Sequence, residues 1–80
     1  MSHTVTAELV ANVLKVDVEV GDTVRAADPV AVLESMKMEI PVLAEVDGVV
    51  AEVIAAVGDV VTDGDPLVVI EEASDERDNG

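Results

Sequence analysis

Val20-Gly21-Asp22-Thr23-Val24 is repeated 37 positions later as Val57-Gly58-Asp59-Val60-Val61. The repeat extends beyond these five residues, because the register that aligns 13–34 with 50–71 gives 10 identities in 22 positions. Each half alone would be too small to bury a stable core. Two similar halves can bury their apolar faces against each other, so the repeat predicts one domain with a pseudo-twofold axis.

The composition predicts that these halves are built from strands. Valine contributes 19 of the 80 residues, and leucine and isoleucine add eight. β-Branched residues fit a pleated strand better than a helix. Val16, Val18 and Val20 alternate with Asp17 and Glu19, which predicts a half-buried strand. Gly-Asp and Asp-Pro pairs break the chain at short intervals and predict tight turns. Short strands at this spacing are typical of an all-β sandwich or barrel.

Length, charge and residue types exclude several classes of function. Eighty residues make one small domain, and the absence of cysteine excludes disulfides and thiol chemistry. A net charge of −14 with no aromatic residue argues against a nucleic-acid partner. His3 has no partners at metal-ligand spacing, so no metal site is expected. We see neither a membrane-spanning run nor a signal peptide, and therefore expect a cytoplasmic protein with no membrane partner.

The sequence also predicts where the folded domain ends. We expect a single domain over residues 1–72 and a disordered acidic tail over 73–80, which lacks apolar anchors. The first few residues are expected to fray. Lys37 aligns with Ser74, so one half turns back as a hairpin where the other half runs into the tail. Symmetry then places the hairpin at the end of the barrel remote from Glu71.

The hairpin is the segment Glu34-Ser35-Met36-Lys37-Met38-Glu39. A short connection is needed between the flanking strands, with Met36-Lys37 at its centre. Because it contains no Gly or Asn, we predict a type I turn rather than a type I′ turn. Pro41 cannot donate to a ladder, which predicts an edge or bulged strand after the turn. Asp47-Gly48 predicts a second hairpin turn.

The segment 34–39 resembles the biotin attachment motif of biotin carboxyl carrier domains, in the biotinyl/lipoyl attachment family. The repeats at 20–22 and 57–59, and Gly48, also fall where that family has them. The resemblance covers roughly residues 4–71 and is closest to the short free-standing biotinylated proteins of bacteria. It implies a flattened antiparallel barrel of two four-stranded sheets with quasi-twofold symmetry and no thumb loop.

The resemblance implies a non-catalytic carrier. A biotin protein ligase would join biotin to the amine of Lys37 through an amide. A biotin carboxylase would then carboxylate the biotin, and a carboxyltransferase would pass the carboxyl group on. The expected system is a biotin-dependent carboxylase, first of all an acyl-CoA carboxylase of fatty acid biosynthesis, with this chain monomeric in isolation.

The motif residues receive separate roles. Lys37 is the expected acceptor nucleophile, and its flanking methionines are adaptable side chains suited to contact with several enzymes. The two glutamates, Glu34 and Glu39, either steer the chain toward a basic ligase cleft, or discourage the wrong acyl-transfer enzyme, or are the solvated ends of a hairpin. Lys15 lacks methionine neighbours and is expected to be an exposed strand residue. The recognition residues around Lys37 are Glu34, Ser35, Met36, Met38 and Glu39.

Two other classes of protein stay open. One is a lipoyl-type carrier, although lipoyl domains commonly have Asp before the modified lysine, where this chain has Met36. The other is an unmodified adaptor module on the same fold. The chain departs from the family where Ser35 replaces a common alanine. Ala27 aligns with Gly64 of the second repeat, so those two turns are expected to differ in shape.

Overall fold

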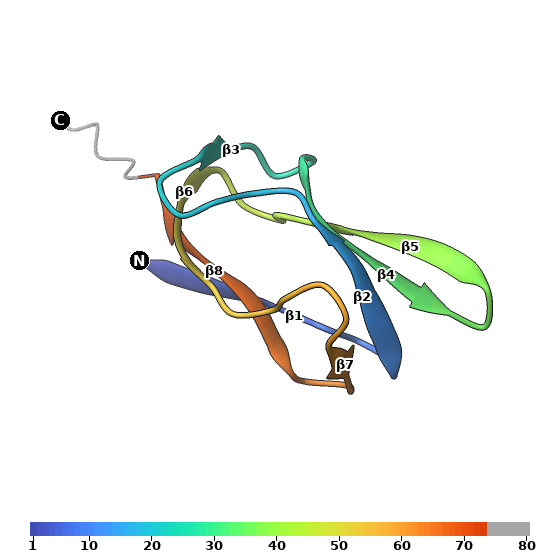
Figure 1. The fold of residues 1–80 in the computed structure, drawn as a ribbon. Helices are drawn as coiled ribbons and strands as arrows, with labels where there is room; N and C mark the ends of the chain where they lie inside the picture. Colours follow the sequence, from blue (N-terminus) through green and yellow to red (C-terminus); the bar gives the residue numbers. More distant parts are fainter. Residues whose placement is uncertain (74–80) are drawn as a thin grey trace, which may run out of the picture.

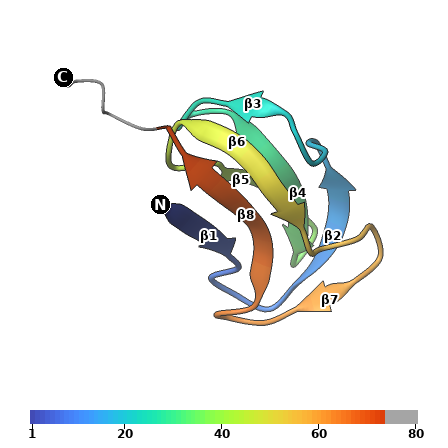
Figure 2. The same ribbon diagram turned by 90° about the vertical axis from the view of Figure 1, so that its left-hand side faces the viewer.

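The computed structural model describes residues 1–73, which form two four-stranded antiparallel sheets and no helix (Figure 1). The sheets face each other as a flattened barrel, with strand orders β1-β8-β6-β3 and β5-β4-β2-β7 (Figure 2). The predicted all-β architecture is therefore confirmed. The strands are β1 Ser2–Thr6, β2 Ala11–Val16, β3 Thr23–Val24, β4 Pro29–Ser35, β5 Met38–Leu43, β6 Gly48–Val53, β7 Val60–Val61 and β8 Pro66–Glu72.

The sequence repeat is a pseudo-twofold relation between the two sheets. Adding 37 to the bounds of β2, β3 and β4 gives those of β6, β7 and β8, and converts one strand order into the other. Hydrogen bonds between the halves also come in pairs. The amide of Gly21 donates to the carbonyl of Val50 at 2.8 Å, and the amide of Gly58 donates to that of Val13 at 2.9 Å. Both glycines have a φ near +98°, which explains why each repeat needs glycine there.

The core is purely aliphatic. No polar or charged residue in the described part of the chain is buried. Because burial of one Val, Leu or Ile side chain contributes about 1.5–3 kcal/mol, these positions supply the main driving force for folding. The largest fully buried side chains come from both halves: Val5, Val13, Val30, Leu33, Val50, Leu67, Val68 and Ile70.

Part of the acidic composition belongs to the turns. Four aspartates each accept a hydrogen bond, at 2.9 Å, from the backbone amide three residues earlier. Such a carboxylate satisfies a backbone donor that the turn leaves unpaired. Because two of them are related to the other two by the repeat, this role belongs to the fold. The four residues are Asp22, Asp28, Asp59 and Asp65.

The alternation at Val16, Val18 and Val20 does not continue as one strand. β2 ends at Val16, Val18 is buried, and Val20 is 64% exposed. The prediction was wrong because a turn follows at once, in which the amide of Glu19 donates to the carboxylate of Asp22. Alternating sequence alone does not reveal that the backbone has left the ladder.

Asp47-Gly48 does not form the predicted hairpin turn. β5 and β6 belong to different sheets, so the connection crosses the barrel. Gly48 is instead buried at the start of β6, where a Cβ would overlap the carbonyl oxygen of Glu71. Its role is the close approach of β6 to β8. Pro41 does lie in an edge strand, because β5 ends its sheet, and that prediction is confirmed.

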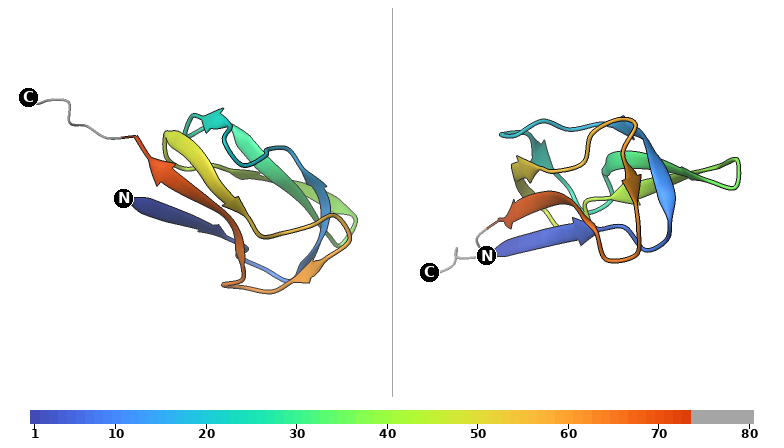
Figure 3. Two further views of the ribbon diagram at one scale, coloured as in Figure 1. Left: turned by 60° about the vertical axis from the view of Figure 1, so that its left-hand side comes forward. Right: turned by 60° about the horizontal axis from the view of Figure 1, so that its bottom comes forward.

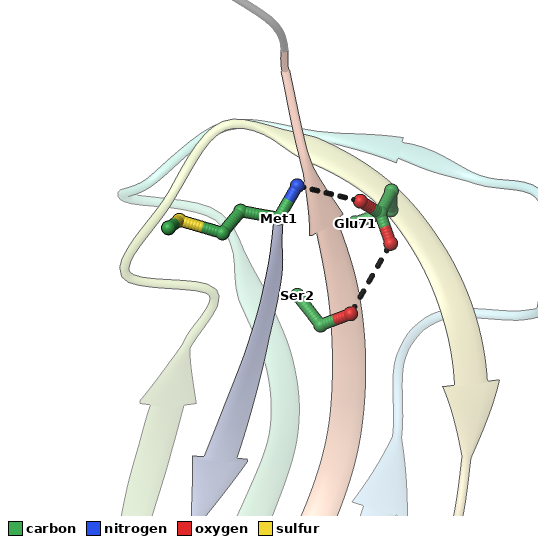
Figure 4. Close-up of polar contacts among 3 residues, drawn as sticks. All are labelled: Met1, Ser2 and Glu71. Atoms are coloured by element: carbon green, nitrogen blue, oxygen red, sulfur yellow. Dashed lines mark hydrogen bonds and ion pairs between the residues drawn. The ribbon is translucent and has the colours of Figure 1, made fainter.

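The N-terminal strand is paired rather than frayed. β1 runs antiparallel to β8, and the amine of Met1 lies 2.7 Å from a carboxylate oxygen of Glu71 (Figure 4). The hydroxyl of Ser2 donates to the other oxygen at 3.2 Å. The hydrogen bond and the positive charge of the amine, then the Ser2 hydroxyl, lower the pKa of the exposed Glu71 carboxyl.

The predicted domain limit falls at the end of the last strand. β8 ends at Glu72, and the amide of Ala73 donates to the carbonyl of Asp47 at 2.9 Å. The rest of the predicted tail, residues 74–80, lies outside the described residues. The part of the chain that is described contains no helix long and apolar enough to cross a membrane.

Candidate functional site

The candidate site is the hairpin that joins β4 to β5. The two strands pair up to Ser35 and Met38, so Met36 and Lys37 form a two-residue loop. Both loop residues have positive φ, 53° for Met36 and 65° for Lys37. Positive φ at both central positions defines a type I′ turn, so the predicted type I turn was wrong. The ladder continues to the last residue before the loop, and the twist of such a tight hairpin favours the primed turn whatever residues occupy it.

The turn is strained. An L-residue other than glycine loses roughly 1–2 kcal/mol in the left-handed region, and here two such residues are adjacent. The strain is held by the surrounding ladder, because β4 is hydrogen-bonded to β5 on one side and to β2 on the other. Strain of this kind gathers at functional sites, where it fixes the direction in which a side chain projects.

The hairpin presents its side chains to solvent. It projects from the end of the barrel opposite the chain termini, as the symmetry predicted (Figure 3). Met36 is 90% exposed and Met38 is 64% exposed. Lys37 is exposed too, and its amine makes no ion pair within residues 1–73. By contrast, the amine of Lys15 lies 3.7 Å from a carboxylate oxygen of Asp17, and Lys15 is exposed as expected.

Two like charges face each other below the turn. Glu34 and Glu39 are directly opposite in the β4–β5 ladder, Glu34 half-buried and Glu39 exposed. Like charges in such a pair destabilise a sheet. Neither carboxylate has a cation within ion-pair distance among the described residues. Both are therefore available to a partner, an arrangement that the sequence left undecided.

A hollow of about 460 Å³ opens beside the lysine. Residues 34–37 form one wall, and Val10, Asn12 and Val60 form the other. Val10 and Val60 are 63% and 67% exposed. Nothing in the local sequence distinguishes these two valines from the many core valines, so they could not be predicted as part of the site.

His3 lies away from this site. Its Nε2 is 2.8 Å from a carboxylate oxygen of Glu45 on the surface. Residues 1–73 contain no group of three or more His, Cys, Asp or Glu side chains placed to hold a metal ion.

An antiparallel barrel that presents a lysine on a tight hairpin defines an attachment domain for a carried group. A family model described as "Biotin-requiring enzyme" matches residues 2–70, and the chain belongs to this biotin/lipoyl attachment family. The expected family is thereby confirmed. Domains of this family are generally non-catalytic carriers.

Curated relatives include short bacterial proteins. The chain is 55% identical over 49 residues to the biotinylated protein TB7.3 homolog of Mycobacterium leprae, an alignment that covers 61% of this chain and 69% of that protein. It is 46% identical over 46 residues to the biotin/lipoyl attachment protein of Bacillus subtilis, an alignment that covers 58% of this chain and 63% of that protein. A biotin-dependent acyl-coenzyme A carboxylase alpha3 subunit of M. leprae is 53% identical over 45 residues, covering 56% of this chain and 8% of the subunit.

Solved structures share the fold. The urea carboxylase of Kluyveromyces lactis matches with a TM-score of 0.83 at 34% identity, over 89% of this chain and 6% of the enzyme. A single-chain long-chain acyl-CoA carboxylase matches with a TM-score of 0.84 at 30% identity, over 91% of this chain and 7% of that enzyme. The lipoyl domain of the 2-oxoglutarate dehydrogenase complex of Azotobacter vinelandii matches with a TM-score of 0.75 at 27% identity, over 89% of this chain and 98% of that domain. The chain is thus similar to the carrier domains of biotin-dependent carboxylases.

Proposed function

We propose that Lys37 carries biotin and that this chain is a biotin carboxyl carrier. The observation that supports the proposal is the geometry of the turn. An exposed amine that makes no ion pair within residues 1–73 lies between two exposed methionines on a strained two-residue loop. A biotin protein ligase would activate the carboxyl group of biotin with ATP. The nitrogen of Lys37 would attack that carbon, the activating group would leave, and the amine would lose a proton as the amide forms.

The motif residues have distinct roles in this proposal. Met36 and Met38 offer unbranched apolar side chains that adapt to different enzymes. Glu34 and Glu39 give the hairpin a negative charge that can pair with basic residues of a partner. Ser35 pairs with Met38 and closes the loop. Biotin is favoured over a lipoyl group because methionine flanks the lysine on both sides and because similar proteins are named as biotinylated.

The fold suits a carrier that catalyses nothing itself. The hairpin lies at one end of the barrel, so the lysine stem and biotin would extend clear of the domain (Figure 1). A tethered group reaches a second active site in an almost intramolecular encounter, which raises its effective concentration. We therefore propose that the chain moves carboxyl groups between a biotin carboxylase and a carboxyltransferase.

The acceptor substrate is proposed from the relatives. An acyl-CoA is favoured, because a carboxylase subunit that acts with acyl-coenzyme A is 53% identical over the matched segment. A role in fatty acid biosynthesis, a monomeric state in isolation and a cytoplasmic location stay predictions. Pull-down with the biotinylated chain tests the partners: recovery of an acyl-CoA carboxyltransferase and a biotin carboxylase is expected. Recovery of a urea or pyruvate carboxylase instead would contradict the proposed acceptor.

Intact-mass measurement on protein from its native host tests the attachment. We expect one biotinyl increment, and streptavidin binding that is lost in Lys37→Arg. Lys15→Arg is the matched control, because it removes the other lysine, and it should keep full biotinylation. A lipoyl increment would favour the lipoyl carrier, and no increment would favour the adaptor module. Streptavidin binding retained by Lys37→Arg would refute the assignment to Lys37.

A further inference from the structure

The pseudo-twofold relation provides an internal control for surface residues. The amide of Ile54 donates to the carbonyl of Leu67 at 2.9 Å, and at the related position the amide of Asp17 donates to that of Val30 at 2.8 Å. Val60 likewise begins β7 as Thr23 begins β3, and each pairs with the inner strand of its sheet. Because the backbone environments match, a difference in side chain between related positions is not required by the fold.

At two exposed positions the second half of the chain has an apolar residue where the first half has a polar one. Ile54 is 42% exposed and Val60 is 67% exposed, whereas their counterparts are Asp17 and Thr23. A chain selected only to fold could carry Asp and Thr at both places, since it does so in its other half. Exposed apolar side chains that the fold does not need are a mark of an interaction surface.

These side chains continue into the lysine hollow. Ile54 and Val60 line a hollow of about 260 Å³, and Val60 also lines the hollow that contains Lys37. Val10 adds a third exposed apolar side chain, on the lysine side. We call the surface formed by Val10, Ile54 and Val60 the β7 face.

Carboxylates border the β7 face. Asp59 and Asp65 line the hollow of Ile54 and Val60, and Glu34 lines the lysine hollow. A complementary protein surface would therefore have an apolar centre with basic side chains around it, as in interfaces whose charged rim sets the orientation of the partners.

We propose that the β7 face is the docking surface for the enzyme that acylates Lys37, a biotin protein ligase with an apolar contact surrounded by basic residues. This inference rests on the proposed function. The ligase must bring its active site to the bare amine, which shares a hollow with Val60. The later enzymes meet biotin at the end of a longer arm, so their active sites do not need to reach this hollow.

The test exchanges side chains between related positions. Initial rates of biotin transfer are measured with purified apo chain, ATP, biotin and the biotin protein ligase of the native host. The variant Ile54→Asp with Val60→Thr is compared with the reciprocal control Asp17→Ile with Thr23→Val. We expect kcat/KM to fall roughly tenfold or more in the first, mainly through KM, because apolar contacts at the interface are lost. The control should stay within about twofold of the wild type, since those positions lie outside the proposed contact.

Two further measurements make the result specific. Ile54→Asn with Val60→Thr should lose a similar factor, which separates lost apolar contact from added charge. Both variants should still reach complete biotinylation at Lys37 by intact mass and keep a cooperative thermal transition. Because the wild type serves as substrate throughout, its failure to accept biotin would refute the proposed function and this inference with it, whereas a normal wild-type rate with an unaffected variant would refute this inference alone.

The following results would overturn the inference. The β7-face variant could be biotinylated within twofold of the wild-type rate, or the reciprocal control could lose as much as the variant. The β7-face variant could also accept biotin normally and then fail only in carboxylation by a biotin carboxylase, which would assign the surface to a later enzyme.

Discussion

Met36→Gly should stabilise the apo domain, although it removes a side chain next to the lysine. Met36 has a φ of 53°, a region that costs a non-glycine residue roughly 1–2 kcal/mol. Glycine avoids this cost but loses about 0.5–1 kcal/mol of additional backbone entropy on folding. Because Met36 is 90% exposed, its side chain contributes little burial to the fold. The net gain should be about 0.5–1 kcal/mol.

Thermal unfolding of the apo chain measures this difference. For a domain of 60–100 residues, 1 kcal/mol shifts Tm by about 4–8 °C, so Met36→Gly should raise Tm by about 2–8 °C. Met38→Gly is the matched control, because Met38 is also an exposed methionine beside the lysine but lies in β5. It should lower Tm, since glycine weakens a strand interior.

The two substitutions should therefore change Tm in opposite directions but change the rate of biotin transfer in the same direction. Both remove a methionine next to Lys37, so both should slow biotin transfer by the ligase, measured as initial rate with apo protein. A Tm for Met36→Gly that falls as far as that for Met38→Gly would refute the assignment of strain to the turn.

Three other predictions concern the fold around the site. Gly48→Ala should destabilise the domain by about 1–3 kcal/mol in denaturant unfolding, because its Cβ would overlap the carbonyl oxygen of Glu71, and an unchanged midpoint would contradict this close approach of β6 to β8. Glu39→Ser should raise stability by about 0.5 kcal/mol in the same assay, because it removes the repulsion from Glu34, and an unchanged or lower midpoint would contradict that reasoning. Glu71→Gln should be less stable than the wild type above pH 4.5. Since folding lowers the pKa of Glu71, this difference should shrink as the pH falls through the lowered pKa, and a difference independent of pH would be evidence against the terminal ion pair.

The sequence was sufficient for the architecture because the signal is repeated. The valine-rich halves, the paired glycines and the position of the hairpin all follow from a repeat that is visible without coordinates. The motif around Lys37 is contiguous, so its residues could be named and placed on one hairpin. The last strand, β8, ends at Glu72, the predicted end of the domain.

The predictions that were wrong concern segments whose conformation depends on pairing with distant strands. The turn at Met36 and Lys37 is set by how far the β4–β5 ladder extends, which the loop residues do not encode. Asp47-Gly48 has the composition of a hairpin turn, but sheet membership decides that the chain crosses instead. The repeat also contains the positions of the β7 face, because Ile54 and Val60 differ from the residues with which they align in the first half. Only the fold shows that Ile54 and Val60 line one hollow and that Val60 also lines the hollow of Lys37.

The symmetry also supplies an argument about the two interpretations of the glutamates. Glu34 and Glu71 are related by the repeat, and so are Glu39 and Ser2, and each forms a cross-strand pair. At the terminal end the hydroxyl of Ser2 donates to the carboxylate of Glu71 at 3.2 Å. At the lysine end Glu39 replaces that donor with a second carboxylate, so an attractive pair becomes a repulsive one. A solvated hairpin end would gain nothing from this exchange, whereas a hairpin that must attract a basic enzyme cleft gains charge where the lysine is presented. The predicted loss of stability at this pair is therefore an argument for recognition as the proposed role of Glu34 and Glu39.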